Sequence, residues 1–454
     1  MKIVIFGASG DLAKRKLFPS ISHVEIQGIN INVIGYSRKN LEDTFHKKLC
    51  EFNEYSNEFL KNVKYIQGEY KNLDVLKVEL KDETWPIYYF SVPPEAYSVL
   101  LTELHHLPPG KIAIEKPFGS DLECFKVIKA HIENHNKSHF YFIDHYLLKE
   151  TAVAIPEILA KNFQLACLLD NNGIMNVEII FKEQLGGEGR VYFDKYGIIK
   201  DVIQNHLCEI YALIASNIED WGNELHIGAK RLDVLRSTLP INTKECLFGQ
   251  YDTYTKELGK DSNTETFATV VLRNKSKRWK NVPFVISAGK GMDKKECRIV
   301  LEIKRLAYGI VSEILLKTET SNKKKKKQTK VPEKEIISIK LIFEISPSPS
   351  VYFSVEFSNS ENTEYILYEE REIKEMAKSK FGLFTDHEII FNSLVGDQAF
   401  PVAGVEEAEE AWNIFNSVLE CKNRGFFIYK KGIDFPDEAT SFIKKIKEES
   451  FEDK

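Results

Sequence analysis

Residues 2–13, Lys-Ile-Val-Ile-Phe-Gly-Ala-Ser-Gly-Asp-Leu-Ala, predict the architecture of the first part of the chain. The β-branched run Lys2–Phe6 is typical of a buried parallel strand. Gly7 and Gly10 follow in a GxxGxxA spacing, a variant of the dinucleotide fingerprint, and permit a tight turn into a helix. The N–H groups at the start of that helix would be available to a pyrophosphate. The alternative to a dinucleotide-binding turn is a strand–turn–helix unit that needs its glycines only for packing.

The next predicted strand, Ile31–Tyr36, ends in the basic sequence Ser37-Arg38-Lys39. An NAD site normally places Asp or Glu at this point to bind the ribose 2′-hydroxyl. Arg38 and Lys39 instead suit a 2′-phosphate, and Arg38 is the better candidate because a guanidinium can also stack on adenine. We therefore expect NADP as the cofactor, with a solvated basic turn as the alternative.

Two further apolar runs, Ile87–Val92 and Ile112–Ile114, are also predicted strands. The second leads into Glu115-Lys116-Pro117, where a lysine between a strand and a proline turn could reach both cofactor and substrate. A cis bond at Pro117 would fix this turn.

Within the segment Ile143–Glu150, the six residues Asp144–Lys149 place four ionisable or hydroxyl side chains directly after an apolar run. An open α/β sheet delivers polar groups to the crevice at the carboxyl ends of its strands in this way. His145, Tyr146 and Lys149 are hydrogen-bond donors, and a lysine suits a phosphate dianion. Asp144 would repel that ligand, so we expect it to orient a base elsewhere. An ordinary solvated turn at a strand end is the alternative.

Composition limits the class of protein. The 454 residues should form two or more domains, and the apolar content of 43% is enough for sizeable cores. The formal net charge of −5 gives no general attraction to nucleic acid or membrane. The 7 cysteines are scattered without CxxC pairs, so we expect reduced thiols in the cytoplasm and no metal site. The chain begins in a predicted strand and lacks membrane-length apolar runs, so we expect neither signal peptide nor membrane span.

A predicted helix over Gly197–Ile214 carries apolar residues at helical spacing, with Asp201, Asn205 and His206 beside that stripe. A lone histidine bordering an apolar stripe is usually a satisfied core residue. A histidine supported by a distant aspartate is instead the arrangement that accepts a proton from a hydroxyl.

Eight motifs together resemble the glucose-6-phosphate dehydrogenase family over roughly residues 1–440. In the first half they are GASGDLAKRK at 7–16, VPPEAY at 92–97, EKPFGSDL at 115–122 and IDHYLLKE at 143–150. In the second half they are KEQLGGEGR at 182–190, YFDKYGIIKDVIQNHL at 192–207, RWKNVPFVISAGKGM at 278–292 and GDQAFPV at 396–402.

The resemblance implies an α/β plus α+β protein with a Rossmann-like NADP-binding domain at 1–145. The remainder, 146–454, would be a substrate-binding, catalytic and oligomerisation domain on a large mainly antiparallel sheet. The alternating runs Ile337–Ile345 and Val351–Phe357 fit strands of that sheet. The implied activity is NADP-dependent oxidation of glucose 6-phosphate at C1 to the 6-phosphoglucono-lactone, the first oxidative step of the pentose phosphate pathway. A homodimer or homotetramer is expected.

The resemblance also assigns residues. His206 would be the base and Asp144 its carboxylate partner. The substrate-binding residues would be Lys116, His145, Tyr146, Lys149, Glu183, Asp201, Lys290 and Lys295. The cofactor-binding residues would be Gly7, Ala8, Ser9, Gly10, Asp11, Leu12, Lys14, Arg38, Tyr97 and Lys116.

The chain departs from the family pattern at several points. Leu148 replaces the usual glycine before the motif lysine, and Ser346 stands where a glutamine commonly closes the sugar site.

The run Lys323–Lys327 predicts a disordered insertion over residues 321–330. Animal-type members bind a second, structural NADP through basic residues on a sheet strand; Glu344 here takes the place of an expected arginine. We therefore expect one NADP per chain.

Two other functions remain open at this point. A different NADP-dependent sugar oxidoreductase would share the Glu-Lys-Pro turn but lack the phosphate-binding cluster. The second alternative is a degenerate, non-enzymatic relative that is kept only for binding. The presence of both Asp144 and His206 argues against this alternative.

Overall fold

The computed structural model describes residues 1–24, 29–134, 139–186, 191–217, 223–321, 336–382, 385–421 and 425–452. Apart from Ser321, the insertion predicted at 321–330 lies outside these residues. Contacts within the chain define two compact units. The first is Met1–Leu148 with Leu383–Glu409, and the second is Lys149–Gly382 with Glu410–Lys454. The sequence-based division after residue 145 is linear and does not include the return of 383–409 to the first unit.

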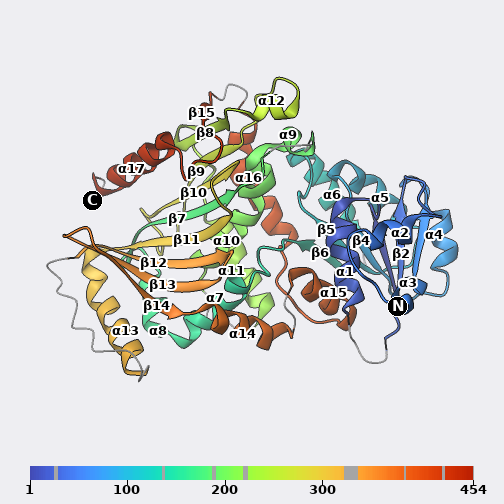
Figure 1. Cartoon of the computed structure of the whole chain (residues 1–454), viewed down its shortest axis with the longest axis horizontal. Helices are drawn as coiled ribbons and strands as arrows, with labels where there is room; N and C mark the ends of the chain where they lie inside the picture. The colour runs from blue at the N-terminus through green and yellow to red at the C-terminus, as the bar shows by residue number, and fades with distance from the viewer. Residues whose placement is uncertain are drawn as a thin grey trace. The chain divides into compact units, whose positions relative to one another are not determined.

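The first unit is built on a 6-stranded sheet in the order β3-β2-β1-β4-β5-β6, in which every pair is parallel (Figure 1). Its strands are β1 (Lys2–Phe6), β2 (Asn32–Ser37), β3 (Val63–Gln67), β4 (Ile87–Phe90), β5 (Lys111–Glu115) and β6 (His139–Ile143). The predicted parallel sheet is confirmed. The order reverses between β1 and β4, and ligands of open α/β sheets bind at such a point, beyond the carboxyl ends of the strands.

Helices complete the first unit. They are η1 (Ala13–Leu17), α1 (Phe18–Ser22), α2 (Phe45–Cys50), α3 (Asn57–Lys61), α4 (Asp74–Glu79), η2 (Pro94–Ala96), α5 (Tyr97–Leu104), α6 (Leu122–Asn134) and α15 (Asp386–Gly396). The last of these comes from far along the chain and packs against α1. A β-bridge between Phe142 and Ala403 also ties this returning segment to the sheet.

The second unit is built on a 9-stranded sheet in the order β14-β13-β12-β11-β7-β10-β9-β8-β15, which runs from bottom to top in Figure 1. The strands are β7 (Ile174–Glu183), β8 (Cys246–Tyr251), β9 (Phe267–Arg273), β10 (Pro283–Lys290), β11 (Glu296–Ile303), β12 (Ile336–Ser346), β13 (Ser350–Phe357), β14 (Asn362–Tyr368) and β15 (Phe427–Tyr429). The pairs β7–β10 and β8–β15 are parallel and the other pairs are antiparallel. The expected large, mainly antiparallel sheet is therefore confirmed.

Helices complete the second unit, and several of them contact the sheet. They are α7 (Glu150–Lys161), α8 (Phe163–Leu168), α9 (Val191–Ile198), η3 (Ile199–Leu207), α10 (Cys208–Ala215), α11 (Glu224–Arg236), η4 (Thr243–Glu245), α12 (Tyr254–Leu258), η5 (Arg305–Ala307), α13 (Tyr308–Ser321), α14 (Glu370–Phe381) and α17 (Asp437–Glu452), while α16 (Val405–Leu419) begins in the first unit. Ile443 and Ile446 of α17 pack on Val271 of β9 and Val285 of β10.

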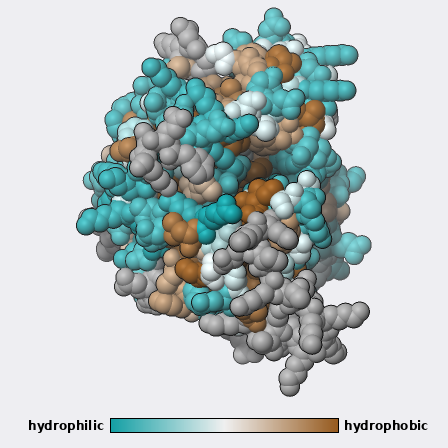
Figure 2. Space-filling view, turned by 90° about the vertical axis from the view of Figure 1, so that its left-hand side faces the viewer, coloured by the Kyte–Doolittle hydropathy of each residue, from teal (hydrophilic) through white to brown (hydrophobic). Residues whose placement is uncertain are grey.

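Hydrophilic residues cover most of the described surface in the view of Figure 2, with hydrophobic residues in smaller areas between them. None of the helices in the described part of the chain is both long enough and apolar enough to cross a membrane.

Candidate active site

The turn after β1 has the shape that the glycine spacing predicts. Gly7 has φ +84°, and a Cβ at this position would lie 2.0 Å from the backbone oxygen of Ser91, which follows β4. Only glycine fits so close an approach of two backbones. The N–H groups of Gly7 and Ala8 donate to the carbonyl of Tyr36 at 2.9 and 3.4 Å. The turn is thus held between the carboxyl ends of β1, β2 and β4.

Basic side chains lie around this turn. Arg38 is exposed directly after β2, and its guanidinium carbon is 5.4 Å from the ring centroid of Tyr70. Lys14 lies over the ring of Phe52 at 5.0 Å, with its ammonium 3.6 Å from Asp11. A glycine turn that admits a close backbone together with an exposed arginine at the end of β2 fits a dinucleotide carrying a 2′-phosphate.

The Glu115-Lys116-Pro117 turn is held by buried tyrosines. The Lys116–Pro117 peptide bond is cis. Tyr97 is fully buried and donates to the carbonyl of Glu115 at 2.6 Å, while Tyr89 donates to the carboxylate of Glu115 at 2.5 Å. Burial raises the pKa of Glu115, and the nearby His387 opposes that rise. Tyr97 therefore supports the turn that carries Lys116, and its expected contact with the cofactor stays a prediction.

The polar cluster after β6 is divided between the units. Asp144, His145 and Tyr146 belong to the first unit, whereas Lys149 opens the second unit as the residue before α7. The Asp144 carboxylate is buried and accepts from the N–H of Tyr146 at 2.9 Å. The ring of His145 meets that of Tyr146 edge-on at 5.0 Å. Leu148, the departure from the family pattern, is also buried.

The second unit gathers three of the predicted substrate residues in one cluster. Glu183 ends β7 and Lys290 ends β10, and these parallel strands place the two residues in register. The Lys290 ammonium lies 2.6 Å from Glu183 and 3.0 Å from Asp201. Burial would lower the pKa of Lys290, but Asp201 and Glu183 raise it above its usual value. Two carboxylates therefore converge on one buried ammonium group.

A kink at Gly197 introduces the helix that carries Asp201 and His206. Gly197 has φ +71°, and a Cβ there would lie 2.4 Å from the Glu265 carboxylate. The chain then forms η3, which is π-helical rather than the regular helix that the apolar periodicity predicted. Such widened turns occur frequently at functional sites.

The side chain of Asn205 satisfies the backbone of this widened turn. Its Nδ2 donates to the carbonyl of Lys200 at 2.8 Å, and its Oδ1 accepts from the N–H of His206 at 2.7 Å. Asn205 thereby fixes the backbone next to His206, which is itself buried. Periodicity could not reveal this, because it reports only which residues face the core.

The charges of Lys149 and Lys295 act on the same buried strand residue, Cys297. Burial raises the pKa of the Cys297 thiol, the carboxylates of Glu344 and Glu296 raise it further, and both lysines oppose the rise. Ser346 pairs with Cys297 across β11 and β12. Within the described part of the chain, the Ser346 hydroxyl oxygen is buried without a hydrogen-bond partner.

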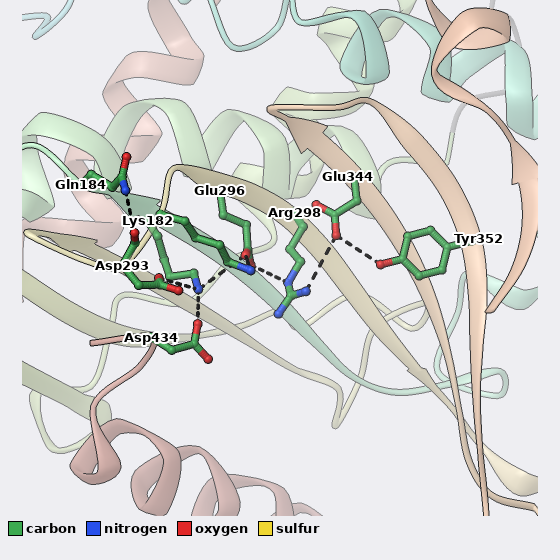
Figure 3. A network of polar contacts seen from close by, with 9 residues as sticks. Lys182, Gln184, Asp293, Glu296, Arg298, Glu344, Tyr352 and Asp434 are labelled. Carbon is green, nitrogen blue, oxygen red and sulfur yellow. Dashed lines mark hydrogen bonds and ion pairs between the residues drawn. The ribbon is translucent and has the colours of Figure 1, made fainter. Parts of the chain in front are cut away.

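A network of ion pairs crosses the sheet beside this region (Figure 3). The ammonium of Lys182, buried on β7, contacts Asp293 at 3.3 Å, Glu296 at 3.4 Å and Asp434. Gln184 donates to the carbonyl of Asp293 at 2.7 Å. These contacts tie β7 to the loop between β10 and β11, which carries Lys295 and passes over the end of β7.

The same network continues across β11 and β12. Arg298 lies 2.8 Å from Glu296 and 3.8 Å from Glu344. Tyr352 donates to Glu344 at 3.2 Å. Burial raises the pKa of Glu344, and Arg298 opposes that rise. Sequence reasoning singled out only Glu344 here, because the other members are separated along the chain. Among the described residues, no group of three His, Cys, Asp or Glu is arranged to hold a metal ion.

The fold and these clusters define a class of protein, an NAD(P)-binding oxidoreductase with a Rossmann-type sheet and a second, mainly antiparallel sheet. The family described as glucose-6-phosphate dehydrogenase matches through its NAD binding domain at residues 4–153 and its C-terminal domain at residues 159–451. The chain belongs to the glucose-6-phosphate dehydrogenase family.

Individual relatives agree with this assignment. The chain is 39% identical to glucose-6-phosphate 1-dehydrogenase of Encephalitozoon cuniculi, covering 99% of this chain and 100% of that protein. It is 30% identical to cytoplasmic glucose-6-phosphate 1-dehydrogenase 5 of Arabidopsis thaliana, covering 98% and 91% of the two chains. A solved glucose-6-phosphate dehydrogenase in complex with glucose 6-phosphate has the same fold, with a TM-score of 0.78 and 24% identity over 98% of this chain and 97% of that chain.

Proposed function

We infer that this chain catalyses the NADP-dependent oxidation of glucose 6-phosphate at C1 to the 6-phosphoglucono-lactone, the first oxidative step of the pentose phosphate pathway. Membership of the family along nearly the whole chain supports this reaction. The observation in the structure that carries it is the convergence of Glu183 and Asp201 on Lys290, because two oriented carboxylates suit the hydroxyl groups of a sugar.

His206 acts as the general base in this proposal. Its imidazole takes the proton of the C1 hydroxyl while C1 loses a hydride, so the C1 carbon becomes the lactone carbonyl. NADP held by the residues of the turn after β1 would supply the acceptor for that hydride. Asp144 stabilises the imidazolium that forms, as carboxylates do in other His–Asp pairs.

The phosphate group of the substrate is bound by His145, Tyr146 and Lys149. Their donors supply charge and orientation at the end of the sugar opposite to C1. Glu183 and Asp201 accept from the sugar hydroxyls, and Lys290 keeps these two carboxylates oriented. Lys116 and Lys295 complete the proposed set of substrate-binding lysines.

The cofactor is bound at the turn after β1, by Gly7, Ala8, Ser9, Gly10, Asp11, Leu12 and Lys14. Arg38 binds the 2′-phosphate of NADP, and its exposed position on Tyr70 supports this role. Lys116 and Tyr97 belong to the same proposed binding site.

One NADP binds to each chain. Two cations on the sheet near Glu344 are already paired. Arg298 pairs with Glu296 and Glu344, and Lys182 pairs with acids from the loop between β10 and β11 and from the segment before α17 (Figure 3). A second dinucleotide at this face would have to compete with those carboxylates for each cation, at a desolvation cost.

The chain forms a homodimer or homotetramer in the cytoplasm, without nucleic acid or membrane partners. Its cysteines are free thiols, and an Arabidopsis relative is named cytoplasmic, which supports this location. Light scattering of the purified chain tests the oligomeric state.

The decisive experiment measures NADPH absorbance with NADP and either glucose 6-phosphate or glucose. We expect a far higher kcat/KM with the phosphorylated sugar, because phosphate binding energy positions C1. Equal values for both sugars would support a different sugar oxidoreductase. The variant His206→Asn serves as the control for activity that does not depend on the proposed base.

A further inference from the structure

The segment that returns to the first unit places a carboxylate against His145. Asp386 is the first residue of α15, and its Oδ2 lies 3.0 Å from Nδ1 of His145. The capping box between Thr385 and Glu388 fixes this end of the helix. The position of Asp386 is therefore set by a well-formed helix start.

Residues on the other side of Asp386 hold it further. Its Oδ1 is 3.6 Å from Nδ1 of His387, and Nε2 of His387 is 3.9 Å from the carboxylate of Glu115. Glu115 is itself fixed by Tyr89. The rings of His145 and His387 stack at 6.2 Å with 30° between their planes. A line of polar side chains thus joins the end of β5 to the end of β6.

We propose that Asp386 is a positioning residue that orients His145 and stabilises its charged form for binding the substrate phosphate. The proposal rests on the proposed function, in which His145 is a phosphate ligand. When Nδ1 donates to Asp386, a neutral imidazole has only a lone pair at Nε2 and cannot donate there. The imidazolium donates from both nitrogens, and the Asp386 carboxylate compensates its charge. Asp386 therefore converts His145 from an acceptor into a donor for a phosphate oxygen.

An acidic residue in the first turn of a helix also has a purely structural function, because it interacts favourably with the helix dipole. That function predicts a loss of stability without a selective change in substrate binding. The two functions are separated by kinetics rather than by unfolding.

The test replaces Asp386 with Asn, Ala or Glu. We expect Asp386→Asn to raise the KM for glucose 6-phosphate roughly 10-fold, the usual value of one hydrogen bond to a charged group, with a smaller change in kcat and none in the KM for NADP. Asp386→Ala should raise it at least as much, and Asp386→Glu should remain near the wild type because it keeps the charge. Asp397→Asn is the matched control: Asp397 lies at the other end of α15, is 80% exposed and contacts Lys111 at 2.9 Å.

A double-mutant cycle with His145→Gln identifies the route of the effect. If Asp386 acts through His145, Asp386→Asn should change the KM little in the His145→Gln background. An equal increase in both backgrounds, or an equal loss of kcat/KM with glucose and with glucose 6-phosphate, would overturn the proposal. An active wild type with an unchanged KM in Asp386→Asn would overturn this proposal alone, whereas a wild type that does not reduce NADP with glucose 6-phosphate would overturn the proposed function as well.

Discussion

Replacing Lys290 with Met should destabilise the protein and weaken substrate binding together. The Lys290 side chain is 3% exposed, and its ammonium contacts Glu183 and Asp201 at 2.6 and 3.0 Å. It also lies 4.9 Å from the ring centroid of Phe193. Methionine has a similar volume, so the substitution removes the charge and leaves two carboxylates facing each other.

The magnitude follows from the exposure of those carboxylates. Removing one partner of a fully buried ion pair costs about 3–5 kcal/mol, because the other charge is left uncompensated. Glu183 and Asp201 are 23% and 22% exposed and can recruit water, which reduces the loss. We expect the free energy of unfolding to fall by about 2–3 kcal/mol. The KM for glucose 6-phosphate should rise, since the proposed acceptors of the sugar hydroxyls lose their orientation.

Urea unfolding followed by tryptophan fluorescence measures the stability. Lys294→Met is the matched control, because Lys294 lies in the loop that follows Lys290, is 53% exposed and pairs with Glu296. Its loss should cost less than about 1 kcal/mol, as for other exposed ion pairs. If Lys290→Met lowers the free energy of unfolding no more than Lys294→Met does, Lys290 does not hold the two carboxylates as inferred.

The pH dependence of the Lys290 contribution has a definite sign. The pKa of Lys290 is raised in the folded chain from its usual 10.5, with burial opposing and the two carboxylates causing the rise. A group whose pKa is higher in the folded chain than in the unfolded chain contributes its full stabilisation at any pH below the pKa it has in the unfolded chain. The difference in the free energy of unfolding between the wild type and Lys290→Met should therefore be constant near neutral pH. It should decline only as the pH rises above 10.5 and through the folded pKa.

Three further predictions concern the proposed active site and the number of NADP molecules bound per chain. His206→Asn should lower kcat by roughly 10²–10⁴-fold, the usual contribution of a positioned general base, and Asp144→Asn should lower it less; near-normal turnover in His206→Asn would end this mechanism. Arg38→Ala should narrow the preference for NADP over NAD mainly through KM, because the lost contact stabilises the ground state and the transition state equally. An unchanged preference would show that Arg38 is merely a surface residue that does not bind the 2′-phosphate. Calorimetry with NADP should give a stoichiometry near one per chain, since Glu344 and its neighbours occupy the cations of the sheet; a value near two would contradict this.

Features set by local sequence could be predicted. The turn after β1 requires a positive φ at Gly7 and the absence of a Cβ, and both requirements are written into the residue type. The short β-branched runs correctly predicted parallel strands, because strands buried on both faces are apolar throughout. Arg38 could be placed after β2 because its position depends only on where that strand ends.

Features that depend on distant contacts could not be predicted from local patterns. The returning segment 383–409 joins the first unit through packing with α1 and a bridge to β6, so no linear boundary could describe it. His145 and Asp386 are 241 positions apart, and neither residue type specifies the other as its partner. The π-helical winding of η3 was missed for a different reason: apolar periodicity does not distinguish it from a regular helix, and the bond from the Asn205 side chain to the carbonyl of Lys200 is seen only in the structure.

The sequence by itself determined the residues that supply the chemistry: glycines at the dinucleotide turn, a basic strand end, and the donors after β6. It could do so because their function depends on residue type and on position at a strand end. Only the tertiary structure decided how distant polar residues are brought together. Glu183 and Lys290 lie in register on parallel strands, and Lys182 lies among acids from the loop between β10 and β11 and from the segment before α17. Ion pairs and hydrogen bonds act over a few ångströms, and only the folding of the chain brings such distant residues within that range.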